Sequence, residues 1–435
     1  MELLQTTAEL KAVLSPVEQV AYLTDAWDES DQLNWVTDEI NMSFQNPASG
    51  SLLIKGGYKK HEKHFVIKFT SKFQLVEGNG NPIERCMTLI GDSQTGVITA
   101  MLLEGVGEYR DESTNLSEID WIEIQDCLKA TGDEKIWQLQ KQGFKAFSAG
   151  EVTIPPVIYL PFKGFGDLHL KGAHKKQGDI YVFKIATAFP GNIAQDLQPS
   201  QGLMIAFDSR TAEPLMLLRD EGHLTDLRTA IAGRNAAEAM MPADEISGIG
   251  VLGTGVQARL QIALIKSLYP HCSNLAVWGH TKANTLTYAK EMSENGWTVS
   301  IVETPKQVAD ISNLIITTTP SEVALLDADD ITYQNTLIIA IGSDMPGKVE
   351  LSPALLNKAD AVLIDSISQG KDHGNAAVAI GNQMITASDL QEFGDFLTNG
   401  YKDPKSKNKL RLFLSSGIGV QDLQIVEAVI AGSQR

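Results

Sequence analysis

The sequence predicts an α/β protein in which a parallel sheet covered by helices follows two β-rich segments of similar sequence. Three observations lead to this fold class. Strand-like and helix-like segments alternate from residue 249 onward, a glycine-rich turn joins the first of these strands to the first helix, and residues 50–73 resemble residues 166–189. A chain of 435 residues is long enough for two or three domains.

The two similar segments come first along the chain. Residues 50–73 read GSLLIKGGYKKHEKHFVIKFTSKF, and residues 166–189 read GDLHLKGAHKKQGDIYVFKIATAF. Nine of the 24 aligned positions are identical, whereas average residue usage would give about one or two by chance. We therefore interpret residues 1–112 as a degenerate tandem copy of residues 113–240.

The second copy shows the signals of a β-meander followed by a helix. Residues 182–187 alternate with a period of two, and residues 203–207 and 214–218 predict two further strands. Residues 224–240 are rich in alanine and predict a helix, with Thr225 as its N-cap.

From residue 249 the pattern changes to alternating strands and helices, which favours a parallel sheet with right-handed crossovers. Strands are expected at 249–252, 275–278, 299–302, 313–317, 336–341 and 361–365, and helices at 256–268, 282–294, 305–309 and 352–357. The polar segment 399–409 predicts a loop, and residues 420–431 predict a final helix.

The turn after the first of these strands carries a dinucleotide fingerprint of the Rossmann type. Gly253 allows the tight turn, Gly255 lets the backbone approach a pyrophosphate, and Ala258 lets the helix pack against the strand. The N–H groups and the positive dipole end of the helix attract phosphate. The expected phosphate-binding residues are Gly253, Thr254, Gly255, Val256, Gln257 and Ala258.

The end of the second strand of this sheet bears on the choice of cofactor. A site specific for NAD usually places an acidic residue about 20 residues after the glycines, but no Asp or Glu occurs between Ile246 and Lys290. His280, Thr281 and Lys282 stand there instead and suit a 2′-phosphate. NADP(H) is therefore favoured, and NAD(H) remains open.

Composition limits the possible partners. The net charge of −18 and the pI near 4.9 argue against nucleic acid as a main partner, because phosphate contacts need a basic face. Three widely spaced cysteines predict neither a disulfide framework nor a metal site. No apolar stretch approaches the length of a membrane span, and no basic-then-apolar leader begins the chain, so we expect a cytoplasmic protein without a membrane partner.

Four further motifs narrow the function. They are the Lys184 motif Phe183-Lys-Ile-Ala-x-x-Phe-Pro-Gly-Asn192, the Arg228 motif Leu224-Thr-Asp-Leu-Arg-Thr-Ala-x-Ala-Gly233, Thr317-Thr-Thr-Pro-Ser321, and Ala340-Ile-Gly-Ser-Asp-Met-Pro-Gly-Lys-Val-Glu-Leu351. Together with the fingerprint, this ordered set resembles the ornithine cyclodeaminase/μ-crystallin family over residues 113–435.

The resemblance implies an NAD(P)-dependent oxidoreductase that acts at the α-carbon of a small amino or imino acid. It implies a substrate domain at 113–240, completed by about 384–435, and a Rossmann domain at 241–383. The family default is cyclodeamination of ornithine to proline and ammonia. Ketimine or imino-acid reduction and amino-acid dehydrogenation are the enzymatic alternatives, and a cofactor-binding, crystallin-like or sensor protein is the non-enzymatic one.

The resemblance also assigns roles that suit the side chains. Arg228 can form a fork to the substrate carboxylate, Lys184 can add a second charge, and Asp344 can accept and return a proton. Thr318 and Ser343 are expected to line the cofactor cleft. The structural alternatives are an ion pair for Arg228 and a capping role for Asp344, and we expect Glu350 to be structural.

The chain departs from the family pattern at two positions. Val157 stands where many members carry a carboxylate-binding arginine, and Lys171 stands where ornithine-using members carry glutamate. A lysine about 4 Å from a cationic distal amine would repel it by roughly 4 kcal/mol at an effective dielectric constant near 20. Lys171, or His169 beside it, is an alternative carboxylate clamp, and a substrate with a second acid group is another explanation.

The first copy retains Lys55 and Lys68 at the positions of Lys171 and Lys184, but no second glycine fingerprint follows it. It therefore cannot form a second complete active site. Family members pair their substrate domains in a dimer, so residues 1–112 are expected to imitate the partner's domain and give a monomer with an internal pseudo-dimer. A homodimer in which the first copy is an appendage is the alternative.

Overall fold

The structure is a computed structural model, and it describes residues 2–4, 12–13, 35–44, 49–74, 82–106, 116–403 and 409–434. The chain divides into two compact units. The first unit comprises residues 1–132, 151–224 and 425–435, and the second comprises residues 133–150 and 225–424. No helix among the described residues has both the length and the apolar character needed to cross a bilayer.

The first unit contains two sheets of related design. In the first sheet, the order is β1-β6-β5-β4-β3-β2, with β1 parallel to β6 and the other neighbours antiparallel. The bounds of its strands are Glu2–Leu4 (β1), Trp35–Phe44 (β2), Gly50–Lys59 (β3), His64–Gln74 (β4), Pro82–Asp92 (β5) and Ile98–Val106 (β6).

The second sheet has the order β7-β13-β12-β11-β10-β8, with β7 parallel to β13 and β9 also paired with β10. Its strands are Ser117–Asp120 (β7), Val152–Thr153 (β8), Ile158–Phe162 (β9), Gly166–Lys175 (β10), Ile180–Ala188 (β11), Ser200–Asp208 (β12) and Pro214–Arg219 (β13). Helix α3 (Trp121–Thr131) follows β7 through a capping box between Asp120 and Glu123.

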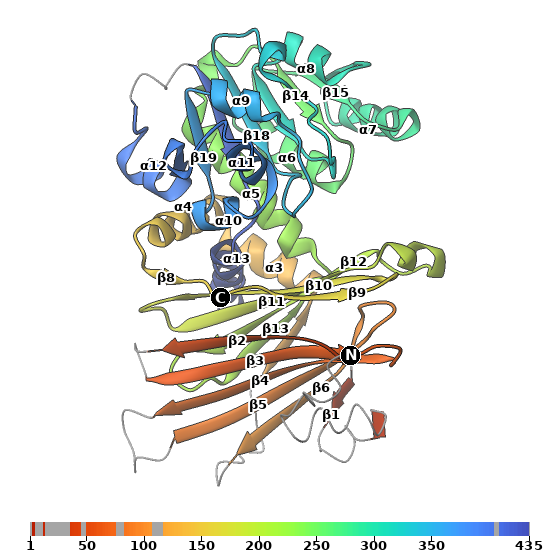
Figure 1. Ribbon diagram of the computed structural model, residues 1–435, viewed down its shortest axis with the longest axis vertical. Coiled ribbons are helices and arrows are strands. Elements are labelled where there is room, and N and C mark those ends of the chain that lie inside the picture. The colour runs from red at the N-terminus through yellow and green to blue at the C-terminus, as the bar shows by residue number, and fades with distance from the viewer. Residues whose placement is uncertain are drawn as a thin grey trace. The chain divides into compact units, whose positions relative to one another are not determined.

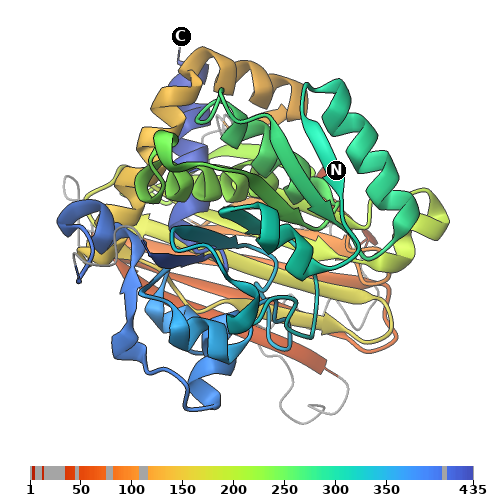
Figure 2. The same ribbon diagram turned by 90° about the horizontal axis from the view of Figure 1, so that it is seen from above.

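The two sheets of the first unit pack face to face, as Figures 1 and 2 show from two directions. Alternate residues of each strand point into the shared core, because side chains along a strand alternate between faces. The Phe69 ring of β4 lies 5.7 Å from the ring of Phe183 in β11, and Tyr58 of β3 stacks on Phe162 of β9 at 4.4 Å. The apolar face of each sheet is thus buried against the other.

The second unit is built on an eight-stranded sheet whose neighbouring strands all run parallel, in the order β16-β15-β14-β17-β18-β21-β19-β20. Its central strands are buried apolar runs, as expected for a sheet covered on both faces. The strands are Ile249–Leu252 (β14), Asn274–Trp278 (β15), Thr298–Ile301 (β16), Leu314–Thr317 (β17), Thr336–Ala340 (β18), Ala361–Ile364 (β19), Leu390–Glu392 (β20) and Leu410–Leu414 (β21).

Helices connect these strands and complete the unit. Two of them, α5 and α13, begin in one unit and end in the other. The helices are Asp133–Ser148 (α4), His223–Met240 (α5), Val256–Lys266 (α6), Lys282–Glu294 (α7), Pro305–Ile311 (α8), Pro353–Lys358 (α9), Ile367–Gly370 (α10), Gly374–Gly381 (α11), Phe393–Asn399 (α12) and Gly419–Ser433 (α13). Short 3₁₀ segments occur at Pro190–Gln195, Ala243–Glu245, Ala328–Asp330 and Ala387–Asp389.

The predicted parallel sheet is confirmed, and its expected strands agree with the observed ones to within one or two residues. Strand β21 was not predicted, although it lies between β18 and β19. The N-cap assignment of Thr225 was wrong, because α5 begins earlier, at His223, where the Asp220 carboxylate accepts a hydrogen bond from the Leu224 N–H at 2.8 Å. Of the expected loop at 399–409, residues 404–408 lie outside the described residues.

Candidate active site

The glycine turn between β14 and α6 has the shape that a dinucleotide phosphate requires. Gly253 has φ of 118°, and a Cβ there would lie 2.5 Å from Oγ1 of Thr318. A Cβ on Gly255 would meet nothing within 4 Å, so open space lies above the turn. Gly255 is the N-cap of α6 and provides no side-chain cap, which leaves the first N–H groups of the helix for a ligand. The residues present therefore fit a pyrophosphate.

The remaining fingerprint residues hold this turn. Ala258 is fully buried, as close packing of α6 on the sheet requires. Gln257 is turned toward α5, where its Nε2 donates to the carbonyl oxygen of Asp226 at 3.0 Å and to its Oδ1 at 3.1 Å. Thr254 and Val256 are partly or largely exposed beside Gly255. The helix that begins at the glycine turn is thus bonded directly to the helix that carries Arg228.

The guanidinium group of Arg228 is buried and anchored on two sides. Its Nε donates to Oδ1 of Asp422 at 3.1 Å, and its Nη1 donates to Oε1 of Gln421 at 2.9 Å. Gly417 packs against it so closely that a Cβ there would lie 2.5 Å from Nη1. These bonds leave Nη2 without a hydrogen bond to the residues that the structure describes. The ion pair considered as an alternative for Arg228 is therefore present, and it leaves one edge of the guanidinium for a ligand.

The buried carboxylate of Asp365 holds the loop at residues 415–417, which packs against Arg228. Oδ2 of Asp365 accepts from the N–H groups of Ser416 and Gly417 at 2.9 and 2.7 Å and from Oγ of Ser415 at 3.0 Å. Burial raises the pKa of Asp365, although these donors act against the shift. Asp365 therefore positions the loop that sets the orientation of the Arg228 side chain.

Asp344 lies in the loop after β18, at the carboxyl edge of the sheet. Its side chain is 47% exposed, and Oδ1 accepts from Nζ of Lys348 at 2.7 Å. The preceding residue, Ser343, is buried and accepts from Nδ2 of Asn375 at 2.6 Å, so its own hydroxyl proton is available for another acceptor. Thr318, after β17, donates to the Leu252 carbonyl oxygen at 3.3 Å. In α/β sheets ligands bind at this edge.

The three residues considered for cofactor choice lie together on the surface. Thr281 is the N-cap of α7 but makes no capping hydrogen bond with its side chain. His280 and Lys282 flank it, and all three are exposed. A phosphate at this helix start would meet the helix dipole as well as the Lys282 charge.

Lys184, Lys171 and His169 lie in the second sheet of the first unit. Lys184 in β11 stands directly opposite Lys171 in β10, and His169 lies two residues before Lys171 on the same face of the sheet. The buried Phe183 and Ile185 point to the other face. Lys184 is itself buried. His169 Nε2 lies 3.3 Å from Oδ1 of Asp167.

Asp220, which sequence reasoning missed, is fully buried near Lys184. Burial raises its pKa to about 6, although the Leu224 N–H and the Lys184 charge act in the opposite direction. Its Oδ1 has no hydrogen-bond partner among the described residues, while Oδ2 caps the start of α5. The position of Asp220, four residues before the Arg228 motif begins, was an available signal. Asp422 and Asp365 are far from that motif in sequence and offered none.

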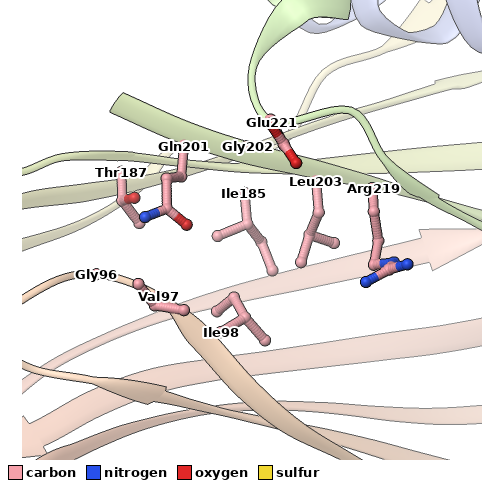
Figure 3. A pocket seen from close by; sticks show the side chains of 10 residues that line it. All are labelled: Gly96, Val97, Ile98, Ile185, Thr187, Gln201, Gly202, Leu203, Arg219 and Glu221. Carbon is pink, nitrogen blue, oxygen red and sulfur yellow. The ribbon is translucent and has the colours of Figure 1, made fainter. Parts of the chain in front are cut away.

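A cavity of about 200 Å³ opens between the two sheets of the first unit (Figure 3). Ile185 and Leu203 line it from the second sheet, and Ile98 of β6 lines it from the first, together with Gly96 and Val97 of the turn before β6. Ile185 follows Lys184 in the same strand and therefore points to the other face. The cavity is thus on the opposite side of the second sheet from the two lysines.

A parallel sheet with this glycine turn at its carboxyl edge defines the class, a protein with a dinucleotide-binding fold. The chain belongs to the ornithine cyclodeaminase/mu-crystallin family, whose sequence profile matches residues 125–432, which confirms the resemblance. Among its relatives, the alanine dehydrogenase of Archaeoglobus fulgidus is 28% identical over 66% of this chain and 87% of its own length. The iminosuccinate reductase of Paracoccus denitrificans is 25% identical over 60% of this chain and 79% of its own length.

Solved structures show the same fold. An archaeal alanine dehydrogenase dimer with bound NAD superposes with a TM-score of 0.65 at 23% identity, covering 73% of this chain and 96% of that chain. The Δ1-pyrroline-2-carboxylate reductase of Thermococcus litoralis, in complex with NADH and L-proline, also gives 0.65, at 18% identity, with 73% and 97% coverage.

Proposed function

We propose that this chain transfers hydride to or from the α-carbon of a small amino or imino acid, with NAD(P) as the cofactor. The observation that carries the proposal is the buried Arg228, whose Nη2 is left for a ligand. The helix that carries Arg228 is bonded through Gln257 to the helix that begins at the glycine turn. A buried guanidinium with a free edge suits a carboxylate, and the glycine turn suits the phosphates of a dinucleotide. Membership of the family supports the same chemistry.

Each residue then has a defined task. Arg228 binds and orients the substrate carboxylate through Nη2, and Lys184 supplies a second positive charge for the same group. Asp344 accepts a proton during oxidation and returns it during reduction, since its partly exposed carboxylate exchanges protons with solvent. The bound nicotinamide supplies or accepts the hydride. Thr318 and Ser343 line the cofactor cleft.

The arrangement of the two lysines bears on the substrate. Cyclodeamination of ornithine is the default for the family, but Lys171 stands directly opposite Lys184 on one face of the second sheet. The Asp220 carboxylate near Lys184 offsets part of the charge of that lysine, and the Lys171 ammonium disfavours a substrate with a cationic distal amine. We therefore favour imino-acid reduction or amino-acid dehydrogenation, with Lys171 or His169 as a further carboxylate clamp. The names of the A. fulgidus and P. denitrificans relatives are in keeping with this choice.

For the cofactor, we favour NADP(H). His280, Thr281 and Lys282 form an exposed polar cluster at the start of α7. No acidic residue occurs between Ile246 and Lys290 that could bind the 2′-hydroxyl of NAD(H). Lys282 would pair with a 2′-phosphate. NAD(H) is the alternative, because solved relatives are described with NAD or NADH.

We further propose that residues 1–112 are a degenerate copy of the substrate domain and replace the partner subunit of a dimer. The pairing register supports this, since Lys55 opposes Lys68 in the first sheet as Lys171 opposes Lys184 in the second. The sheets also share the arrangement in which the first strand runs parallel beside the last. The apolar face that a partner would otherwise cover is covered within the chain.

A panel of amino acids, keto acids with ammonia, and cyclic imines, each followed at the nicotinamide absorbance, tests the proposed reaction. Consumption of NAD(P)H with an imine or a keto acid plus ammonia identifies reduction. Release of ammonia from ornithine without net change in NADH identifies cyclodeamination. Absence of dinucleotide binding and of turnover with every substrate would contradict the proposal.

A further inference from the structure

The Glu350 carboxylate is the meeting point of two loops at the carboxyl edge of the parallel sheet. It is fully buried, and each of its oxygens accepts two hydrogen bonds. Oε1 accepts from the N–H and the Oγ1 of Thr319 at 2.6 and 2.9 Å, and Oε2 accepts from Oγ1 of Thr317 at 2.7 Å and the N–H of Gly342 at 2.9 Å. The loop after β17 is thereby joined to the loop after β18.

These two loops carry residues assigned to the cofactor cleft. Thr318 lies between the two threonines that bind Glu350, and it packs on Gly253 of the glycine turn. Ser343 and Asp344 directly follow Gly342. The backbone of Gly342 has no room for a side chain, because a Cβ would lie 2.2 Å from the Thr319 carbonyl oxygen. Glu350 therefore links the ends of β17 and β18 directly, and Thr318 connects this pair to the glycine turn after β14.

A second set of bonds supports Glu350 itself. Oδ1 of Asn375 accepts from the N–H groups of Glu350 and Leu351 at 2.8 and 3.0 Å, while its Nδ2 donates to Oγ of Ser343 at 2.6 Å. The backbone that presents Glu350 is thus tied to the residue before Asp344. A buried carboxylate whose four acceptor sites are all matched is held in one orientation.

We propose that Glu350 is a positioning residue that holds the 317–321 and 340–344 loops in the geometry that binds the dinucleotide and presents Ser343 and Asp344. The assignment rests on the proposed function and goes beyond the structural role expected from the sequence. Glu350 touches neither cofactor nor substrate in this account. It acts through Thr317, Thr319 and Gly342.

The opposite edge of the same sheet offers a matched control. Asn313, just before β17, is buried and also makes four hydrogen bonds. Its Nδ2 donates to the carbonyl oxygens of Glu245 and Asn335 at 2.7 and 3.2 Å, and its Oδ1 accepts from the N–H groups of Ser247 and Gly248 at 2.9 and 3.4 Å. Asn313→Asp therefore disturbs as many bonds as Glu350→Gln, but away from the loops.

The experiment measures dinucleotide binding by calorimetry, with NADPH and NADH as probes, beside thermal unfolding and kcat. Glu350→Gln places an amide NH2 against donors, and Thr317→Val removes one donor. We expect both variants to raise the Kd for the dinucleotide. Glu350→Gln should raise it by about tenfold or more, because hydrogen bonds to charged groups are the strong ones. Thr317→Ser, which keeps the hydroxyl donor, should restore the wild-type Kd. Asn313→Asp should lower the unfolding temperature without changing that Kd.

Two outcomes would overturn the assignment. One is a Kd within about twofold of wild type for both Glu350→Gln and Thr317→Val, and the other is an equal rise in Asn313→Asp. Either result, with a wild-type protein that binds dinucleotide, leaves the proposed function standing. A wild-type protein that binds neither NADPH nor NADH would instead overturn the proposed function and this assignment together.

Discussion

Arg228 donates from Nε to Oδ1 of Asp422 at 3.1 Å, and both side chains are buried. The two residues are 194 positions apart in the sequence. Asp422 compensates part of the guanidinium charge and fixes its plane, so that Nη2 points to one place. Removal of one partner from a buried ion pair of this kind lowers the free energy of unfolding by about 3–5 kcal/mol.

Arg228→Lys should weaken substrate binding. A lysine keeps the charge but loses the planar fork, so we expect the KM for the amino or imino acid to rise by about tenfold or more, with the dinucleotide Kd unchanged. Arg234→Lys on the same helix is the control, because Arg234 pairs with Glu238 and packs over Trp137. A larger KM change in the control than in Arg228→Lys would refute the role of Arg228.

Asp344→Asn should abolish most turnover while leaving both ligands bound. An amide cannot accept the proton, and general acid–base groups typically contribute on the order of 10² to 10⁴ in rate. Single-turnover kinetics with the most active substrate of the panel measures the loss. Asp310→Asn, whose exposed carboxylate pairs with Lys306, is the control. Retention of near wild-type kcat in Asp344→Asn would show that another group moves the proton.

Lys282→Ala should change cofactor preference. Loss of the charge beside a 2′-phosphate is expected to raise the Kd for NADPH by roughly tenfold, because hydrogen bonds to charged groups contribute about 1.5–3 kcal/mol, and to leave the Kd for NADH nearly unchanged. Lys290→Ala in the same helix α7 is the control, since its exposed side chain lies near Glu294. Equal effects of Lys282→Ala on the two dinucleotides would contradict the assignment of Lys282 to a 2′-phosphate.

Asp220 should make stability depend on pH in a defined direction. Its pKa is raised in the folded protein from 3.8 to about 6 by burial, so the native state binds the proton more tightly than the unfolded state does. This group's contribution to the free energy of unfolding is therefore present in full below pH 4 and is lost as the pH rises through about 6.

Asp220→Asn removes that pH dependence. Relative to wild type, the variant should gain up to about 3 kcal/mol in free energy of unfolding between pH 4 and pH 7, at 1.36 kcal/mol per pKa unit. Denaturant unfolding at both pH values measures it. Asp179→Asn, with its largely exposed side chain, is the control. A wild type that grows more stable relative to Asp220→Asn over this range would contradict the assignment.

The internal pseudo-dimer predicts the mass of the particle in solution. Light scattering after size exclusion should give 47.3 kDa, the mass of one chain, at micromolar concentration. Phe69→Asp would place a charge in the core between the sheets, and we expect it to unfold the first unit or to expose the apolar face of the second sheet. A wild-type dimer formed through the Phe183 face of the second sheet would reject the pseudo-dimer.

The sequence predicts the parallel sheet because its signals are local. Ile249 to Leu252 form a short apolar run, and Gly253 and Gly255 mark the turn that follows. Strand β21 escapes such analysis, because it inserts between β18 and β19, two strands that are consecutive in the sequence and give no local sign that a distant segment separates them. The residue that caps α5 was misassigned because Asp220 reaches the helix from beyond the predicted boundary.

At the candidate site, too, only residues in local sequence patterns could be predicted. Motifs name Arg228, Lys184 and Asp344, because these side chains occur in recognisable local patterns. Their partners do not, since Asp422 pairs with Arg228 only through tertiary folding. Glu350 stands inside a recognised motif, but its hydrogen bonds to Thr317 and Gly342 depend on the register of two strands. The roles of these side chains remain predictions.

The most direct test follows one isotope. The protein is incubated with NAD(P)H that carries deuterium at the transferable position of the nicotinamide, together with a cyclic imino acid or a keto acid and ammonia, and the amino-acid product is examined by mass spectrometry and NMR. Our account predicts deuterium at the α-carbon of the product, and a much slower formation of that labelled product with Asp344→Asn. Product formed without label at that carbon, or cofactor bound with no product from any substrate of the panel, would contradict it.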